Sequence, residues 1–307
     1  MPLPDENRLV LVGGATGNQG SVVARELLAN GFGVRALTRD PGKQAARELA
    51  ALGAEVVVGD YDDPTSLRKA ADGVYGVFSV HNFMSGVDVE IRHGKALAEA
   101  AKEVDVAHFV YSSAASANLE TGIAFHDSKY EIEKHIQALG LPWTVLRPVF
   151  LMKNWHELTG PVLSGVLPWP LDPEKPLQQV AIEDIAAFTV LAFQDPDRWL
   201  GQAVDLAGDE LTLPQVADTL GRVTGRPVRY VQVSWEDFFK VMAGATGLDI
   251  DENFVRLFRW FNDVGYEADI PALRAAHPRL LDLESFLRFD GWGEKEEAGA
   301  GTSHSHG

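Results

Sequence analysis

The sequence predicts an α/β fold in which a doubly wound parallel sheet is accompanied by a smaller C-terminal α/β domain. Between residues 8 and 148, short apolar runs alternate with segments of helical period. The runs are apolar throughout rather than at every second position, which is typical of parallel strands covered by helices on both faces. The first run ends in a glycine-rich turn, "GGATGNQG", that leads into a helical pattern. Together these observations indicate repeated strand–helix units.

The expected strands, in order, are "RLVLVG", "GVRALTR", "AEVVVGD", "GVYGVFSV", "VAHFVYSS" and "PWTVLRP". The helices between them carry recognisable ends. Asp40-Pro41 and Asp63-Pro64 each offer an N-cap followed by proline at the first helical position. Glycines stand where three helices should end, at Gly53, Gly73 and Gly140.

After Pro148 the pattern loosens into a loop-rich segment with prolines and two tryptophans. We expect residues 1–150 to form the first domain, with strands near 178–183 and 203–207 returning to it. A helix capped by Asp184 should follow the first of these strands. Residues 151–290 are expected to form a smaller substrate or lid domain. Residues 291–307 are expected to form a disordered tail, because the segment "EKEEAGAGTSHSHG" lacks apolar side chains other than alanine.

Composition narrows the function classes. The chain holds 27 Lys and Arg against 44 Asp and Glu, a net charge of −17, which argues against binding nucleic acid through phosphate contacts. It has no cysteine, which excludes disulfides and thiolate chemistry. Helix capping explains the acidic residues Asp60, Asp62 and Asp63, so no metal site is predicted. No apolar run reaches the ~18 residues of a membrane helix, and we expect a soluble cytoplasmic protein.

The glycine-rich turn has a chemical explanation. Gly14 permits the tight turn, Gly17 lets the backbone approach a pyrophosphate, and Gly20 lets the helix pack against the strand. The N–H groups from Asn18 to Gly20 then form an anion site at the helix start. The spacing is G-x-x-G-x-x-G rather than G-x-G-x-x-G, and a ligand-free glycine turn is the alternative. Its place at the first strand–helix turn favours dinucleotide binding in a Rossmann-like domain.

The end of the second strand indicates which dinucleotide is bound. Arg39 stands where an acidic side chain would select NAD, and arginine suits the 2′-phosphate of NADP. Lys43, one turn into the expected next helix, adds a second positive contact. The alternative is that both are ordinary surface cations. NADP(H) is therefore the expected cofactor.

Several segments together resemble the NmrA-like family of atypical short-chain dehydrogenases. They are "GATGNQG", "LTRDP", "VVGDYDD", "GKALAEAAKE", "FVYSSAA", "HDSKYEIEKHI" and "TVLRPVFLMKN", continued by "VAIEDIA", "LAGDELTLPQVA" and "RWFNDVGYEADI". The resemblance covers nearly all of residues 8–280. It implies an NADP-binding Rossmann domain and a small domain closing over the nicotinamide. Members include NADPH-dependent quinone reductases and catalytically silent redox sensors that act on protein partners.

The resemblance also assigns site residues. Thr16, Gly17, Asn18 and Gln19 would line the pyrophosphate, and Asp60 and Tyr61 would flank the adenine. The ribose and nicotinamide would lie beside Val80, His81, Asn82, Ser112 and Lys129, with Pro148 to Phe150 at the amide edge. An aromatic pocket floor from Phe150 and Trp155 is a further expectation, with plain core as the alternative.

The catalytic apparatus is incomplete. Short-chain dehydrogenases pair Tyr-x-x-x-Lys on one helix face with a preceding Ser. Here Ser112 and Lys129 are present, but Phe125 stands four residues before Lys129, and Tyr130 points about 100° away.

Two interpretations follow from this incomplete set. One is an NADPH-dependent reductase of small conjugated electrophiles such as quinones, protonated by solvent, Lys129 or His126. The other is a redox sensor that regulates a protein partner, in which Lys129 only anchors the ribose.

Overall fold

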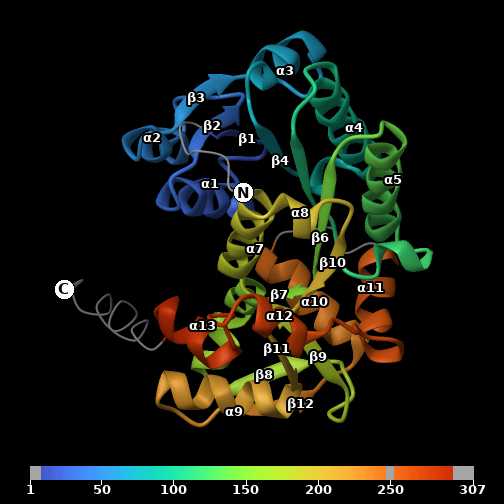
Figure 1. Ribbon diagram of the computed structural model, residues 1–307. Coiled ribbons are helices and arrows are strands. Elements are labelled where there is room, and N and C mark those ends of the chain that lie inside the picture. The colour runs from blue at the N-terminus through green and yellow to red at the C-terminus, as the bar shows by residue number, and fades with distance from the viewer. Residues whose placement is uncertain (1–7, 247–251, 293–307) are drawn as a thin grey trace, which may run out of the picture. The chain divides into compact units, whose positions relative to one another are not determined.

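The computed structural model describes residues 8–246 and 252–292. The chain divides into two compact units, each with its own internal packing (Figure 1). The first comprises Met1–Val149 and Ile182–Leu206, and the second Phe150–Ala181 and Ala207–Gly307. Residues 182–206, which include one of the two strands expected to return to the first domain, belong to the first unit. Among the described helices, none is both long and apolar enough to cross a bilayer.

The first unit is built on a seven-stranded sheet whose strand pairs are all parallel. The strand order is β10-β6-β5-β4-β1-β2-β3. Strand order reverses between β1 and β4, the position at which open α/β sheets bind ligands. This confirms the predicted Rossmann-like, doubly wound α/β fold. The strands are β1 (Leu9–Val12), β2 (Gly33–Thr38), β3 (Glu55–Val58), β4 (Gly76–Val80), β5 (His108–Ser112), β6 (Trp143–Pro148) and β10 (Ala203–Leu206).

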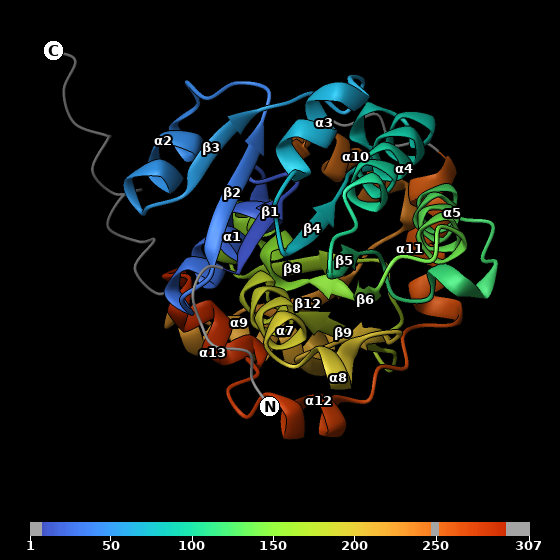
Figure 2. The same cartoon turned by 45° about the horizontal axis from the view of Figure 1, so that its top comes forward.

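Helices cover both faces of this sheet (Figure 2). On one side α1 packs against α7, and on the other α4 packs against both α3 and α5. Short 3₁₀ segments, η1 (Phe83–Ser85) and η2 (Ala117–Leu119), follow β4 and β5. The helices are α1 (Asn18–Ala29), α2 (Gln44–Ala51), α3 (Pro64–Ala71), α4 (Val87–Glu103), α5 (Ala124–Ala138), α7 (Ile182–Gln194) and α8 (Pro196–Trp199).

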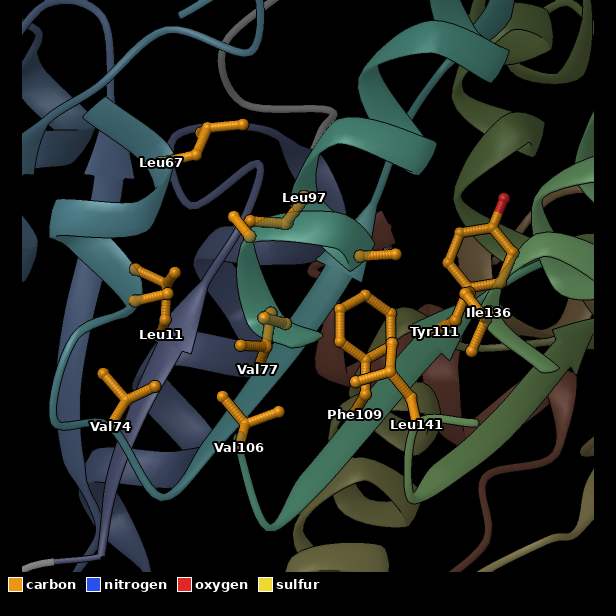
Figure 3. Close-up of a cluster of buried hydrophobic side chains, with 14 of the residues drawn as sticks. Leu11, Leu67, Val74, Val77, Leu97, Val106, Phe109, Tyr111, Ile136 and Leu141 are labelled. Atoms are coloured by element: carbon orange, nitrogen blue, oxygen red, sulfur yellow. The ribbon is translucent and has the colours of Figure 1, made fainter. Parts of the chain in front are cut away.

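The core on the α3–α5 side explains why the strands are apolar throughout. Figure 3 shows Leu11 and Phe109 from the strands facing Leu67, Leu97 and Ile136 from the helices. All five side chains are buried. Because the other strand face is covered by α1 and α7, the central strands β1, β4 and β5 leave neither set of alternating side chains in water, and both sets are mostly apolar.

Helix ends only partly follow the predictions. Asp63 caps α3 as expected, accepting a hydrogen bond from the Thr65 N–H. The prediction that Asp40 caps the next helix is wrong. α2 begins at Gln44, and the Asp40 side chain instead accepts a hydrogen bond from the Gly42 N–H within a turn. Because the Asp40 side chain bonds to an amide of the turn rather than to an amide of a helix, the helix begins later in the chain than predicted. Asp184 lies inside the first turn of α7 rather than capping it.

The glycine stops are confirmed, since each follows a helix end at positive φ. Their φ angles are +100° at Gly53, +71° at Gly73 and +62° at Gly140.

The second unit holds a three-stranded sheet, ordered β11-β9-β7, and a two-stranded one, β12-β8. Its strands are β7 (Phe150–Leu151), β8 (Val166–Trp169), β9 (Pro176–Val180), β11 (Asp209–Thr212) and β12 (Arg229–Gln232). Its helical segments are η3 (Met152–Leu158), α6 (Thr159–Leu163), α9 (Leu213–Thr224), α10 (Trp235–Thr246), α11 (Glu252–Asp263), α12 (Ile270–Ala276) and α13 (Leu283–Phe289).

Only one of the two strands expected to rejoin the first sheet does so. β10 pairs with β6, whereas β9 pairs with β11 and β7. The reason lies in two buried glutamines of β9 that need hydrogen-bond partners. Gln179 accepts from the Trp155 indole N–H, and Gln178 accepts from the Ala268 N–H, both within the second unit.

The start of the predicted disordered tail is ordered. Trp292 is buried and stacks on His156, with ring centroids 5.2 Å apart. The remainder of that predicted tail, residues 293–307, lies outside the described residues.

Replacement of Gly20 tests the close contact between α1 and the turn after β1. A Cβ at this position would stand 2.2 Å from the Gly14 carbonyl oxygen, and backbone cannot yield as a side chain does. We expect Gly20→Ala to lower the free energy of unfolding by about 1–3 kcal/mol, measured by thermal unfolding. Gly160→Ala, where a Cβ meets nothing within 4 Å, is the control and should change little. Equal stability of the two variants would contradict the argument.

Candidate functional site

The glycine turn leads directly into the exposed N-terminus of α1. Gly14 adopts φ +67°, and its carbonyl oxygen accepts the Gly17 N–H at 2.9 Å. Gly17 is the N-cap of α1 and offers no side chain to the helix amides. The first turn of α1 also has no acidic residue. Gly17 and Asn18 are exposed, so unsatisfied N–H groups and the positive helix end are accessible to an anion.

Tyr61 supports this turn from behind. Its hydroxyl oxygen accepts the Gly14 N–H at 2.9 Å, while its ring stacks on His93 and meets His81 edge-on. Burial raises the pKa of Tyr61 to about 12, so the phenol is neutral. The geometry therefore gives Tyr61 a supporting role that the sequence did not suggest. Asp60 is engaged in the same loop, accepting the Asp62 N–H.

The two cations predicted to select NADP follow β2. Arg39 is exposed directly after the strand, and its charge helps to lower the pKa of Tyr61, although less than burial raises it. Lys43 is exposed and immediately precedes α2, rather than lying one turn into the helix as predicted.

Lys129 is buried on α5 and is held by two oxygen atoms. Its Nζ donates to the His81 carbonyl oxygen at 2.5 Å and lies 2.7 Å from Glu90 Oε1. His81 follows β4, so this contact places the ammonium at the carboxyl end of that strand. Burial lowers the pKa of His81 to about 3, with a smaller effect of the Lys129 charge. The His81 imidazole is therefore neutral, and its Nε2 lies 3.0 Å from Ser79 Oγ.

Ser112 ends β5 and reaches the glycine turn. Its hydroxyl donates to Gln19 Oε1 at 2.7 Å, joining the end of β5 to the first turn of α1. Val80 and Asn82 flank His81 at the end of β4, with Asn82 exposed. The structure thus gathers the predicted residues from β1, β4 and β5 around one edge of the sheet.

Phe125 occupies the position of the missing proton donor and packs on Phe83, with ring centroids 5.3 Å apart. The neighbouring His126 is buried, and burial lowers its pKa to about 4. Its Nδ1 lies 3.1 Å from Thr121 Oγ1. A histidine that is neutral at pH 7 is a weak general acid, so His126 suits proton donation poorly. Tyr130 instead contacts Lys134, whose Nζ lies 5.2 Å from the centre of its ring.

The remaining predicted residues lie where the two units meet in the sequence. Pro148 is buried at the end of β6, and Phe150 begins the second unit. Phe150 packs against Trp155 and Trp169. Trp155 is fully buried and hydrogen-bonded to Gln179, so the expected pocket floor is wrong for this residue: it is core.

Sequence reasoning missed Glu90. It lies in the first turn of α4 and is 1% exposed. The available signal was its position: Gly94, Leu97 and Ala101 follow at i+4, i+7 and i+11, all on the buried face. A carboxylate on that face needs a partner, and Lys129 supplies it.

Comparison with known proteins shows the family of this chain. The model of the NmrA-like family matches residues 6–287. The chain belongs to the NmrA-like family. An NAD(P)H azoreductase from Xenophilus azovorans is 34% identical over 238 residues, covering 77% of this chain and 81% of that protein.

Solved structures share the fold at lower identity. A new type of NADPH-dependent quinone oxidoreductase from Escherichia coli superimposes with a TM-score of 0.77 at 24% identity, covering 92% of this chain and 98% of that one. The negative transcriptional regulator NmrA in complex with NADP gives a TM-score of 0.73 at 24% identity, covering 96% and 97%. The same fold thus occurs in a reductase and in a regulator.

The buried His126 generates a testable pH dependence. Its pKa is depressed from 6.5 to about 4, so between these values the unfolded chain binds a proton that the native chain does not. Stability should therefore fall as pH falls through this window, by ~1.4 kcal/mol per pH unit for one such group. We expect His126→Gln to remove one group's share of that slope, measured by denaturant unfolding at pH 4.5, 5.5 and 6.5. A native His126 titrating near 6.5 by NMR would contradict this.

Proposed function

We propose that the protein is an NADP(H)-dependent reductase of small conjugated electrophiles such as quinones. The observation that carries the proposal is one edge of a parallel sheet that combines an anion-binding turn, an exposed arginine and a buried lysine. Arg39, Lys129 and Gly17 belong to the loops or helices that follow β2, β5 and β1. A dinucleotide phosphate ester of the NADP type needs the arginine at its 2′-phosphate, the turn at its pyrophosphate and the lysine at its nicotinamide end.

The residues of the turn fit a dinucleotide phosphate. Any side chain at Gly20 would collide with the turn, and the exposed Gly17 leaves its backbone approachable. The N–H groups at the start of α1 would hold the pyrophosphate. Arg39 would pair with a 2′-phosphate, which favours NADP(H) over NAD(H). When bound, the nicotinamide supplies a hydride.

The chemistry left to the protein is limited by Phe125. Without a phenol at this position, only acceptors that need no proton in the hydride step should react well. A quinone meets this condition because its two-electron product is a stabilised anion. Lys129 would balance negative charge and deliver a proton afterwards. General acid catalysis contributes ~10²–10⁴-fold, and a simple ketone would forgo that factor here.

Phe83 and Phe125 favour planar acceptors. Both rings are half-buried in the first unit, after β4 and at the start of α5. Aromatic faces stack on flat conjugated molecules. The azoreductase and the quinone oxidoreductase named above act on conjugated molecules, which adds support by family likeness.

A catalytically silent NADP(H) sensor is the second candidate. It is favoured by Phe125, which stands at the position of the usual proton donor and packs on Phe83. A sensor must bind the oxidised and reduced cofactor with different affinity, because only differential binding shifts a conformational equilibrium.

A panel of acceptors separates the two candidates. With NADPH, we expect absorbance at the nicotinamide band to fall with naphthoquinones and benzoquinones, and to remain nearly constant with simple ketones. The reason is the missing phenol. Thermal unfolding with NADP⁺ and with NADPH is measured in parallel. No turnover with any quinone, together with clear nucleotide binding, would reject the reductase and favour the sensor.

Arg39→Asp tests the cofactor preference. Loss of a charge-assisted contact worth about 1.5–3 kcal/mol should weaken NADP(H) binding by roughly 10–100-fold and leave NAD(H) binding no weaker. Titration calorimetry with both nucleotides measures this. Lys102→Asp, the same charge change at the exposed end of α4, is the control. An unchanged preference in Arg39→Asp would show that another residue reads the 2′-phosphate.

A further inference from the structure

The Lys129 ammonium is part of a buried three-residue network. Glu90 Oε1 lies 2.7 Å from Lys129 Nζ, and Glu90 Oε2 accepts the Ser128 hydroxyl at 2.5 Å. The carboxylate is 1% exposed, so its two oxygens are directed into the protein. Lys129 itself is 7% exposed. The network joins the first turn of α4 to the middle of α5.

The two helices approach closely because Gly94 lies between them. A Cβ at Gly94 would stand 2.6 Å from Ile132 Cδ1 on α5. The missing side chain lets α4 approach α5, and one turn earlier along α4 Glu90 meets Lys129. The close approach of the two helices at Gly94 thus brings the Glu90 carboxylate within reach of the Lys129 ammonium.

Burying such a pair is costly. Two charges lose their hydration, and an apolar pair of the same size is often as stable. The pair therefore gives little net stability, and a role in fixing geometry explains it better. The fixed geometry is visible: the same ammonium that meets Glu90 donates to the His81 carbonyl oxygen at the end of β4.

We propose that Glu90 is a positioning residue that fixes the Lys129 ammonium beside the end of β4, where the reduced acceptor takes up its charge. This inference rests on the proposed function. Glu90 acts through Lys129 alone, holding the ammonium by its carboxylate while Ser128 orients that carboxylate. Without Glu90, the ammonium loses its buried counter-charge and its fixed place.

A second network of the same chemistry supplies a matched control. Glu133 on α5 is buried, accepts the Ser113 hydroxyl at 2.5 Å and pairs with Arg147 at 2.6 Å. It thus combines a serine, a glutamate and a cation, as the first network does, but its cation is Arg147 rather than Lys129. Glu133→Gln breaks an equally buried ion pair without touching the lysine.

A double-mutant cycle tests the proposal. Glu90→Gln, Lys129→Met and the double variant are compared in the full-length protein. The kcat and KM for NADPH are measured with a methyl-substituted naphthoquinone, and folding is followed by thermal unfolding. We expect Glu90→Gln to lower kcat by about tenfold, with a smaller change in KM. The double variant should be no slower than Lys129→Met, because Glu90 acts only through the lysine. Losses from Glu133→Gln and Lys129→Met should instead multiply.

Two results would overturn the proposal. One is an unchanged kcat in folded Glu90→Gln. The other is a further loss when Glu90→Gln is added to Lys129→Met. That second comparison holds even where the single Glu90 variant fails to fold, since the double variant buries neither charge. If the wild-type chain reduces no quinone, the proposed function fails. In that case the dissociation constant for NADPH is measured for the same variants. If the losses of affinity in Glu90→Gln and Lys129→Met multiply in the double variant, the coupling between the two residues is rejected independently of turnover.

Discussion

The contact between the turn after β1 and the start of α1 is the constraint on which the rest of the first unit depends. Gly20 lies so close to the Gly14 carbonyl that no side chain fits between them. This closeness directs the N-terminus of α1 toward the point where strand order reverses, between β1 and β4. Tyr61 and Ser112 then join the ends of β3 and β5 to the same turn. Three strands, β1, β3 and β5, thereby share one organised edge.

Local chemistry determines how much of this was predictable. The glycine turn, the alternation of strands and helices in the doubly wound sheet and the Asp63 cap each depend on residues adjacent in the sequence. All three can therefore be predicted from the sequence. The strand with which β9 or β10 pairs does not depend on adjacent residues alone. β9 and β10 are both short strands. Backbone pairing with β11 and β7 and the tertiary hydrogen bonds of Gln178 and Gln179 hold β9 in the second unit. The predicted start of α2 was wrong because an Asp-Pro pair occurs in turns as readily as at a helix N-cap.

The candidate site shows the same division. Lys129 and Ser112 were predicted from a motif, but their contacts join helices and strands far apart in the chain. The pair of Glu90 with Lys129 spans α4 and α5, and no spacing rule connects them. The neutral state of His81 and His126 likewise depends on burial, which raises the cost of the charged form. Periodicity shows that a face is buried, but it does not show what the buried groups meet.

The distribution of charge at this edge bears on the choice between reductase and sensor. A chain that only bound a dinucleotide would need the backbone N–H groups of the turn, the exposed Arg39 and a group that anchors the ribose. None of these contacts requires a buried ion pair. Glu90 and Lys129 carry a desolvation cost that nucleotide affinity alone does not explain, because the lysine charge is already balanced within the protein. An ammonium whose charge is already balanced by a carboxylate is suited to a substrate whose negative charge appears only during the reaction. It needs little reorganisation at that moment, which is how preorganised sites stabilise transition states. The cost of this pair therefore favours chemistry at the end of β4.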